Sequence, residues 1–112
     1  MKAVEAAFFF IYTTMSTFQE IINSGQPVLI DFYATWCGPC KAMSPIIEGI
    51  GKEVKGQARV LKVDVDKNQA LASSLQIQAV PTLAIFKNGK VVWKHPGGMD
   101  KHTLKSTLLS FI

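Results

Sequence analysis

The chain contains two cysteines, Cys37 and Cys40, and both lie in the hexapeptide WCGPCK at residues 36–41. If a helix begins at Cys37, its sulfur lies at the helix N-terminus, and the Cys40 sulfur lies one turn further on, within bonding distance. One thiol can then attack a disulfide bond while the other resolves the product. This spacing is typical of a pair that cycles between dithiol and disulfide.

The residues between the cysteines favour the same chemistry. A helix N-terminus offers unpaired N–H groups and the positive end of the helix dipole, and both stabilise a thiolate at Cys37. Pro39 suits the first helical turn, where its missing N–H costs nothing, and Gly38 lets a partner backbone approach. We therefore expect Gly38 and Pro39 to tune the pair. The alternative on these residues alone is a purely structural cysteine pair.

A Cys-x-x-Cys sequence is also half of a tetrahedral zinc site. The other half would have to come from His95 and His102, which are spaced more widely than the histidines of zinc motifs. We therefore predict no metal site and expect both histidines at the surface.

An aspartate, Asp31, interrupts the apolar run at residues 28–33. A carboxylate among apolar side chains loses hydration, and this raises its pKa unless the group is paired. Because this run leads into the cysteine loop, Asp31 is a candidate acceptor for the Cys40 proton when that thiol attacks. The alternative is an aspartate at a strand edge that faces water.

Lys62, on the next predicted strand, is the candidate partner of Asp31. It alternates with Asp64 and Asp66 along the chain. A solvent-exposed face formed by these three residues is the alternative for Lys62.

The hydrophobic pattern predicts strands and helices that alternate along the chain. Strands are expected at 8–13, 28–33, 60–65, 82–86 and 91–94, and helices at 16–23, 37–54, 68–75 and 100–110. Asn88-Gly89 predicts a tight hairpin between the last two strands. The order β-α-β-α-β-α-β-β-α predicts an α/β fold with a mixed sheet and helices on both faces. The active site is then expected at the carboxyl ends of the central strands, where residues 36–40 fall.

Length and charge limit the other possibilities. A chain of 112 residues supports one domain with a hydrophobic core. The formal net charge is +4, but the basic residues are spread from Lys2 to Lys105 with acidic residues between them. No basic run or recognition motif supports nucleic-acid binding. We expect a mild preference for acidic partner surfaces.

The N-terminal segment superficially resembles a secretory signal, with Lys2 before an apolar stretch at residues 6–12. Glu5 interrupts the approach to that stretch, and no small-residue cleavage site follows it. A first strand is therefore expected there. No apolar run is long enough to span a bilayer, and two cysteines are too few for a secreted disulfide scaffold. These features favour a cytoplasmic protein without a membrane partner.

A set of residues spread along the chain resembles the thioredoxin family over essentially its whole length. The set is Asp31, WCGPCK at 36–41, Pro45, Lys62, Val80-Pro81-Thr82, the FKNG segment at 86–89 and Gly97. The resemblance implies a thioredoxin fold, with a central mixed five-stranded sheet flanked by four helices. It also implies a single domain at 1–112, in which residues 1–5 are expected to be a frayed extension.

The same resemblance implies a protein-disulfide reductase that contributes to cell redox homeostasis. Cys37 would be the nucleophile and Cys40 the resolving thiol, with a buried Asp31 as proton acceptor and Lys62 beside it. Substrates would bind a flat apolar surface formed by Trp36, Gly38, Pro39, Val80, Pro81 and Gly97. A cis Val80-Pro81 bond is implied beside the sulfurs, although only about 5–6% of X-Pro bonds in folded proteins are cis, so the residues alone favour an ordinary trans proline.

The resemblance further implies that no cofactor is bound and that thioredoxin reductase supplies electrons from NADPH. The expected partners are disulfide-containing proteins and this reductase. The chain is expected to be a monomer that takes part in electron transport through its cysteine pair. Two alternatives stay open on the sequence: a binding or assembly module that does not need redox cycling, and a disulfide oxidase or isomerase on the same scaffold.

Overall fold

The computed structural model describes residues 15–112. Its elements follow one another in the predicted order. They are α1 (Met15–Ile22), β1 (Val28–Tyr33), α2 (Gly38–Glu53), β2 (Arg59–Asp64), α3 (Gln69–Ser74), β3 (Thr82–Lys87), β4 (Lys90–Pro96) and α4 (Lys101–Leu109). The strand expected at 8–13 and the frayed extension expected at 1–5 lie outside the described residues.

The described strands form one mixed sheet in the order β2-β1-β3-β4. β1 is parallel to β2 and antiparallel to β3, and β3 and β4 form an antiparallel hairpin. The predicted mixed sheet and terminal hairpin are thus confirmed. Four strands belong to the part of the chain that the structure describes, so the fifth predicted strand is not among them.

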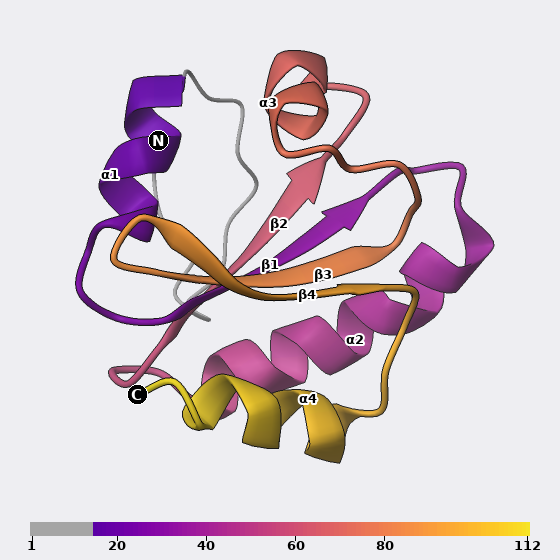
Figure 1. The fold of residues 1–112 in the computed structure, drawn as a ribbon. Helices are drawn as coiled ribbons and strands as arrows, with labels where there is room; N and C mark the ends of the chain where they lie inside the picture. The colour runs from indigo at the N-terminus through magenta and orange to yellow at the C-terminus, as the bar shows by residue number, and fades with distance from the viewer. Residues whose placement is uncertain (1–14) are drawn as a thin grey trace.

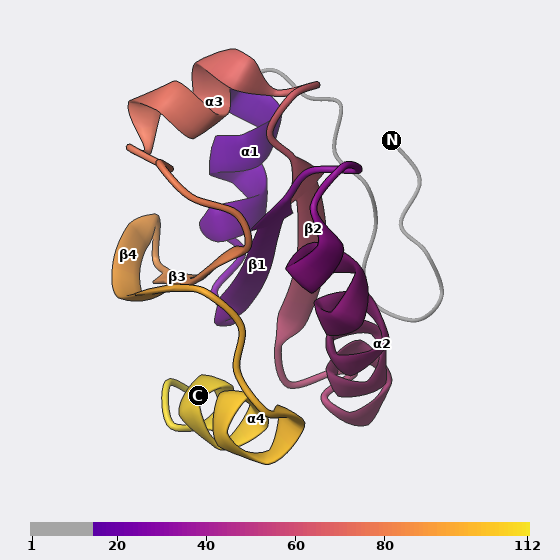
Figure 2. The same ribbon diagram turned by 90° about the vertical axis from the view of Figure 1, so that its right-hand side faces the viewer.

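The helices cover both faces of the sheet, as Figures 1 and 2 show: α1 and α3 lie on one side, and α2 and α4 on the other. Each side has its own hydrophobic core. Phe18 of α1 and Phe32 of β1 are fully buried in the first core, while Ile47 of α2 and Leu104 of α4 are fully buried in the second. A sheet buried on both faces explains why β1 reads as an almost continuous apolar run.

Residues of β1 alternate between these two cores, because side chains along a strand point to opposite faces. Ile30 and Phe32 pack under α1 and α3, whereas Leu29 packs under α2 and α4. Asp31 is two residues from Leu29 and therefore points to the α2 face. This alternation places a carboxylate beneath the helix that carries the cysteines.

The hairpin between β3 and β4 has the predicted two-residue turn. Asn88 and Gly89 have φ angles of 52° and 82°. Positive φ at both central positions is the type I′ requirement that makes Asn-Gly the preferred pair in such turns. The local sequence therefore sets the pairing of the last two strands.

Candidate active site

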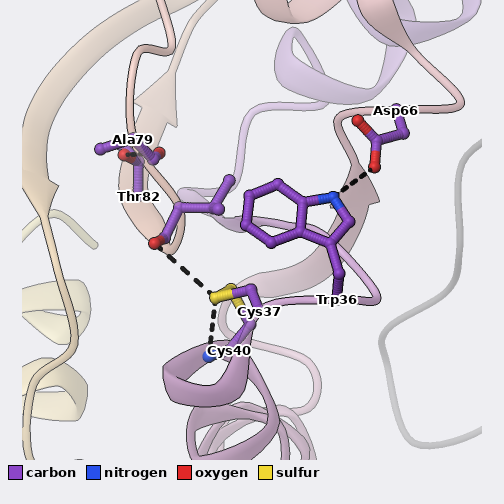
Figure 3. Close-up of a disulfide and its surroundings, with 7 residues drawn as sticks. Trp36, Cys37, Cys40, Asp66, Ala79 and Thr82 are labelled. Carbon is purple, nitrogen blue, oxygen red and sulfur yellow. Dashed lines mark hydrogen bonds between the residues drawn. A yellow bond between two sulfur atoms is a disulfide. The ribbon is translucent and has the colours of Figure 1, made fainter.

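Cys37 and Cys40 are joined by a disulfide at the start of α2, with their Cα atoms 5.3 Å apart (Figure 3). Cys37 is the N-cap residue of the helix, and its sulfur accepts a hydrogen bond from the backbone N–H of Cys40 at 3.2 Å. Both cysteines are buried, with 5% and 3% of their surfaces exposed. In the dithiol form this N–H and the helix dipole would stabilise negative charge on the Cys37 sulfur.

The chain enters α2 through a short turn after β1. The Cys37 N–H donates to the Ala34 carbonyl oxygen at 3.2 Å, which closes this turn before the helix begins at Gly38. Pro39 lies in the first turn of α2, as predicted, and both Gly38 and Pro39 are exposed. The pair is thus held by backbone geometry at the carboxyl end of a central strand.

The Val80-Pro81 segment lies beside the cysteine pair. Its peptide bond is cis, as the resemblance implied, so the trans proline favoured by base rates is wrong. The Val80 carbonyl oxygen is 3.7 Å from the Cys37 sulfur. The Gly97 N–H donates to the Pro81 carbonyl oxygen at 2.7 Å, from a backbone with φ of +97° that favours glycine. Gly97 is thereby brought to the same site.

Trp36 is the most exposed large apolar residue among those described, with 70% of its surface accessible. Its indole N–H donates to an Asp66 carboxylate oxygen at 2.9 Å, and this bond fixes the ring beside the disulfide (Figure 3). A cavity of about 290 Å³ is lined by residues that include Cys40 and Lys62, and a second cavity, of about 200 Å³, borders the Trp36 ring. The smaller one is lined by Trp36, Val65, Ile77, Gln78, Ala79 and Val80.

Asp31 is fully buried in β1, so the alternative of a strand-edge aspartate facing water is wrong. Neither of its carboxylate oxygens has a hydrogen-bond partner. Burial raises the pKa of Asp31 to about 7, and the positive charge of Lys62 opposes part of that rise. A carboxyl group that titrates near neutral pH can accept and return a proton under ordinary conditions.

Lys62 lies directly opposite Asp31 in the β1–β2 register. Only 7% of its surface is exposed, and Asp64 is buried as well, so the alternative of a solvent-exposed face is wrong. The Lys62 ammonium donates to the Ser44 hydroxyl oxygen at 2.6 Å and lies 4.8 Å from the centre of the Tyr33 ring. Lys62 and Cys40 both line the larger cavity, which links the buried charge to the second cysteine.

The sequence reasoning missed two polar residues of the site, Ser44 and Asp66. Ser44 is one helical turn after Cys40 on α2, so i, i+4 spacing from the cysteine was a usable signal. Asp66 follows β2 and reaches Trp36 across 30 positions of sequence. No local pattern marks that contact, because it depends on how β1 and β2 pair.

Residues 15–112 contain neither a metal-binding cluster of side chains nor a helix that could cross a membrane. No group of three or more His, Cys, Asp or Glu side chains there is arranged to hold a metal ion. His95 is half-buried and stacks on Trp93, with ring centres 5.7 Å apart, whereas His102 is exposed. Across the same residues, no helix combines the length and apolar character that crossing a membrane requires.

Comparison with known proteins gives the same assignment as the geometry. The thioredoxin family model matches residues 9–110. The chain belongs to the thioredoxin family. It is 43% identical over 100 residues to a thioredoxin of Porphyra purpurea, covering 89% of this chain and 94% of that protein. A solved thioredoxin variant from Halobacterium salinarum superimposes with a TM-score of 0.85 at 34% identity, covering 99% of this chain and 96% of the other.

A further relative combines two functions in one chain. The bifunctional thioredoxin reductase/thioredoxin of Mycobacterium leprae is 41% identical over 92 residues, which cover 82% of this chain and 20% of that protein. Members of the thioredoxin family are protein-disulfide oxidoreductases, and the cysteine pair of this chain is at disulfide-bonding distance. The thioredoxin fold and the redox-active pair predicted from the sequence are therefore both confirmed.

Proposed function

We propose that this thioredoxin-family protein reduces disulfide bonds in other proteins, with Cys37 as nucleophile and Cys40 as resolving thiol. The observation that carries the proposal is the Cys37–Cys40 disulfide at the N-terminus of α2, with the Cys40 N–H directed at the Cys37 sulfur. Only the Cys37 sulfur accepts this hydrogen bond at the N-terminus of α2. Because the helix N-terminus stabilises negative charge on that sulfur, Cys37 is favoured as the attacking thiolate.

In the first step the Cys37 thiolate attacks one sulfur of the substrate disulfide. The substrate S–S bond breaks, its other sulfur leaves with the electron pair as a thiolate, and a Cys37–substrate disulfide forms. In the second step Cys40 loses its proton to Asp31 and attacks the Cys37 sulfur. The mixed disulfide breaks, the second substrate sulfur leaves as a thiolate, and two protons complete the substrate dithiol.

Asp31 suits the role of proton acceptor because it is buried without a hydrogen-bond partner and its pKa is about 7. Lys62 supports it with a positive charge from the opposite position on β2. Trp36, Val80, Pro81 and Gly97 would form the substrate surface, with the Val80 carbonyl oxygen accepting from an extended substrate backbone. Gly38 and Pro39 would keep the approach to Cys37 open and the turn rigid.

Trapping tests the order of the two cysteines. A Cys40→Ser variant should accumulate a covalent complex with a disulfide-containing protein such as insulin, because the mixed disulfide is not resolved. The matched Cys37→Ser variant should form no such complex. Mass spectrometry under non-reducing conditions measures both, and adducts formed only by Cys37→Ser would reverse the assignment.

The electrons are proposed to come from NADPH through a thioredoxin reductase, while this chain itself binds no cofactor. The relative that joins a reductase to a thioredoxin in one chain supports such a partnership. NADPH oxidation should require the reductase, this chain and a disulfide substrate together. Loss of NADPH oxidation in Cys37→Ser, with an unchanged background rate of the reductase, would identify this chain as the electron carrier.

The proposed setting is the cytoplasm, with residues 1–112 acting as one monomeric domain in electron transport. A reducing compartment keeps the pair ready as a dithiol, which supports this setting. Neither nucleic acid nor membrane is a proposed partner. Cell fractionation tests the location, and light scattering after size-exclusion chromatography tests the monomer.

A further inference from the structure

Ser44 connects the buried lysine of the site to the surface of α2. Its hydroxyl oxygen accepts from the Lys62 ammonium at 2.6 Å, and its O–H donates to a Glu48 carboxylate oxygen at 3.3 Å. A hydroxyl carries one hydrogen, so while that hydrogen is directed at Glu48 the oxygen is free to accept from Lys62. The three side chains form a chain of hydrogen bonds that runs from β2 to α2.

In this arrangement the Lys62 ammonium donates to Ser44, and not to the carboxylate that the sheet places opposite it. Asp31 and Lys62 are paired in the β1–β2 register, yet neither Asp31 oxygen accepts a hydrogen bond. The ammonium instead lies against Ser44 and over the Tyr33 ring. A buried carboxylate and a buried ammonium would ordinarily satisfy one another, because each is costly to leave unpaired.

We propose that Ser44 is a positioning residue for the resolving step, because its hydroxyl holds the Lys62 ammonium against α2 and so limits the positive charge that reaches Asp31. The catalytic part of this proposal rests on the proposed role of Asp31 as proton acceptor. Ser44 acts only through Lys62 in this scheme. It lines the same cavity as Cys40 and Lys62, and so lies where the resolving thiol and the buried charge meet.

The proposal predicts how Asp31 responds when the hydroxyl is removed. Without its Ser44 acceptor, the Lys62 ammonium turns to the unpaired Asp31 oxygens and stabilises the ionised carboxylate. The pKa of Asp31, now about 7, then falls. A carboxylate that holds its proton less tightly is a weaker base toward Cys40, so the resolving step slows at neutral pH.

Ser44→Ala leaves the other titratable side chains on this side of the sheet in place, but Glu48 loses its hydrogen bond from the Ser44 hydroxyl. The strands and helices packed here contribute Tyr33 on β1, Asp64 on β2, Lys87 on β3, His95 on β4, Lys41, Glu48 and Glu53 on α2, and Lys101 and Lys105 on α4, while Cys40 does not titrate in the disulfide. Glu53 is bound by Lys101 and Lys105. Glu48 is the group that competes for Lys62, because it is bonded to the same hydroxyl.

The decisive measurement is a titration of the Asp31 carboxyl carbon by NMR in the oxidised protein. In Ser44→Ala the pKa of Asp31 should fall by about 1 unit, the low end of the effect of an opposite charge brought into contact. Ser44→Thr keeps the hydroxyl and should restore the wild-type titration. An unchanged or higher pKa in Ser44→Ala overturns the proposal, since Lys62 would then have moved to Glu48 or to solvent.

Two controls separate this role from a general effect of the substitution. In a Lys62→Met background, adding Ser44→Ala should leave the Asp31 titration unchanged, and a shift of the same size there overturns the route through Lys62. Ser74→Ala removes a helical hydroxyl that bonds only a backbone carbonyl in α3, and it should have no effect. If Ser44→Ala does not fold, Ser44→Val against its isosteric counterpart Ser44→Thr makes the same comparison.

The rate of the resolving step links the titration to catalysis. The acid limb of its pH profile should move to lower pH in Ser44→Ala, together with the Asp31 titration, and return in Ser44→Thr. If Asp31→Asn leaves the resolving rate unchanged, the proposed role of Asp31 fails, while the titration of Ser44→Ala still decides whether Ser44 positions Lys62.

Discussion

Asp31 shows how the site trades stability for reactivity at the level of one residue. A fully buried carboxyl group with no hydrogen-bond partner favours its neutral form, because ionisation in that position lacks solvation. The same burial brings the pKa of the group to about 7, where it can exchange a proton with a thiol. Above neutral pH, ionised Asp31 therefore lowers the free energy of unfolding.

We expect this cost to be visible as a pH-dependent difference between wild type and Asp31→Asn. The Asp31 pKa is raised from 3.8 to about 7 on folding, so between these values the folded state binds more protons than the unfolded chain. Stability contributed by this group is present at low pH and is lost as pH rises through 7. The loss approaches about 4 kcal/mol above pH 8, and it is absent in Asp31→Asn.

Urea denaturation of both oxidised proteins at several pH values between 4 and 8.5 measures the difference in free energy of unfolding. The free energy of unfolding of Asp31→Asn should increase relative to that of wild type as pH rises. Asp66→Asn, which removes an exposed carboxylate, serves as the control and should show no comparable gain. A difference between Asp31→Asn and wild type that stays constant with pH would contradict the prediction.

Residues of the site differed in how far the sequence could predict them. Cys37 and Cys40 were predictable because their geometry is local to one helical turn, and Asp31 because a carboxylate is anomalous in an apolar strand. Lys62 had two open interpretations, which only the strand register distinguishes. The i, i+4 spacing of Ser44 from Cys40 placed it near the pair, but not its contact with Lys62, because a lysine on another strand supplies that contact.

The elements themselves follow closely from local pattern. The bounds predicted for β1 and for the Asn88-Gly89 turn match the structure, because an apolar run between turn residues and a positive-φ pair are both local signals. Asp100, the first residue of the helix expected at 100–110, is the N-cap of α4, and its carboxylate accepts from the Thr103 N–H at 2.9 Å. Sheet order was less accessible, since it depends on contacts between strands distant in sequence.

Helix α4 is attached to the sheet by a few apolar side chains and lies away from the chemistry. Leu104 is fully buried in the core under α2 and α4, whereas Leu109 is half-buried at its edge. Leu104→Ala should lower the free energy of unfolding by about 2–5 kcal/mol through lost burial and a residual cavity. Leu109→Ala, the matched change on the same helix, should cost about 1 kcal/mol.

Guanidinium denaturation measures both stability changes, and insulin reduction at a temperature where each variant is folded measures activity. The rate per folded molecule should match wild type, because no α4 residue lines either cavity beside the cysteine pair. A slow but fully folded Leu104→Ala protein would show that α4 supports the site as well as the core.

In the molecule as a whole, the cores on the two faces of the sheet stabilise the fold, and one end of the sheet carries the reactive groups. Packing on both faces buries the centre of the sheet, so the carboxyl end of β1 is where the chain can present reactive groups. The disulfide and the exposed Trp36 ring lie there (Figure 3), and the Val80 carbonyl oxygen contacts the Cys37 sulfur. Charged residues are spread over the molecule and are not confined to the end of the sheet that carries the cysteine pair. Substrates should therefore respond both to the weak positive field of the whole protein and to individual charges near the pair.

The formal net charge of +4 predicts a measurable preference among substrates. An acidic peptide carrying a disulfide should be reduced faster than a basic peptide with the same disulfide loop, because a positive protein attracts it during encounter. Raising the ionic strength from about 0.01 to 0.15 M shortens the Debye length from about 30 to 8 Å, and should reduce that preference in kcat/KM by up to about tenfold.

Two lysine variants test whether the position of a charge matters as well as the net charge. Lys41→Ala and Lys55→Ala remove the same charge from exposed positions, but Lys41 lines the cavity beside Cys40. Lys41→Ala should therefore reduce the preference more, and equal effects of the two variants would show that only net charge matters.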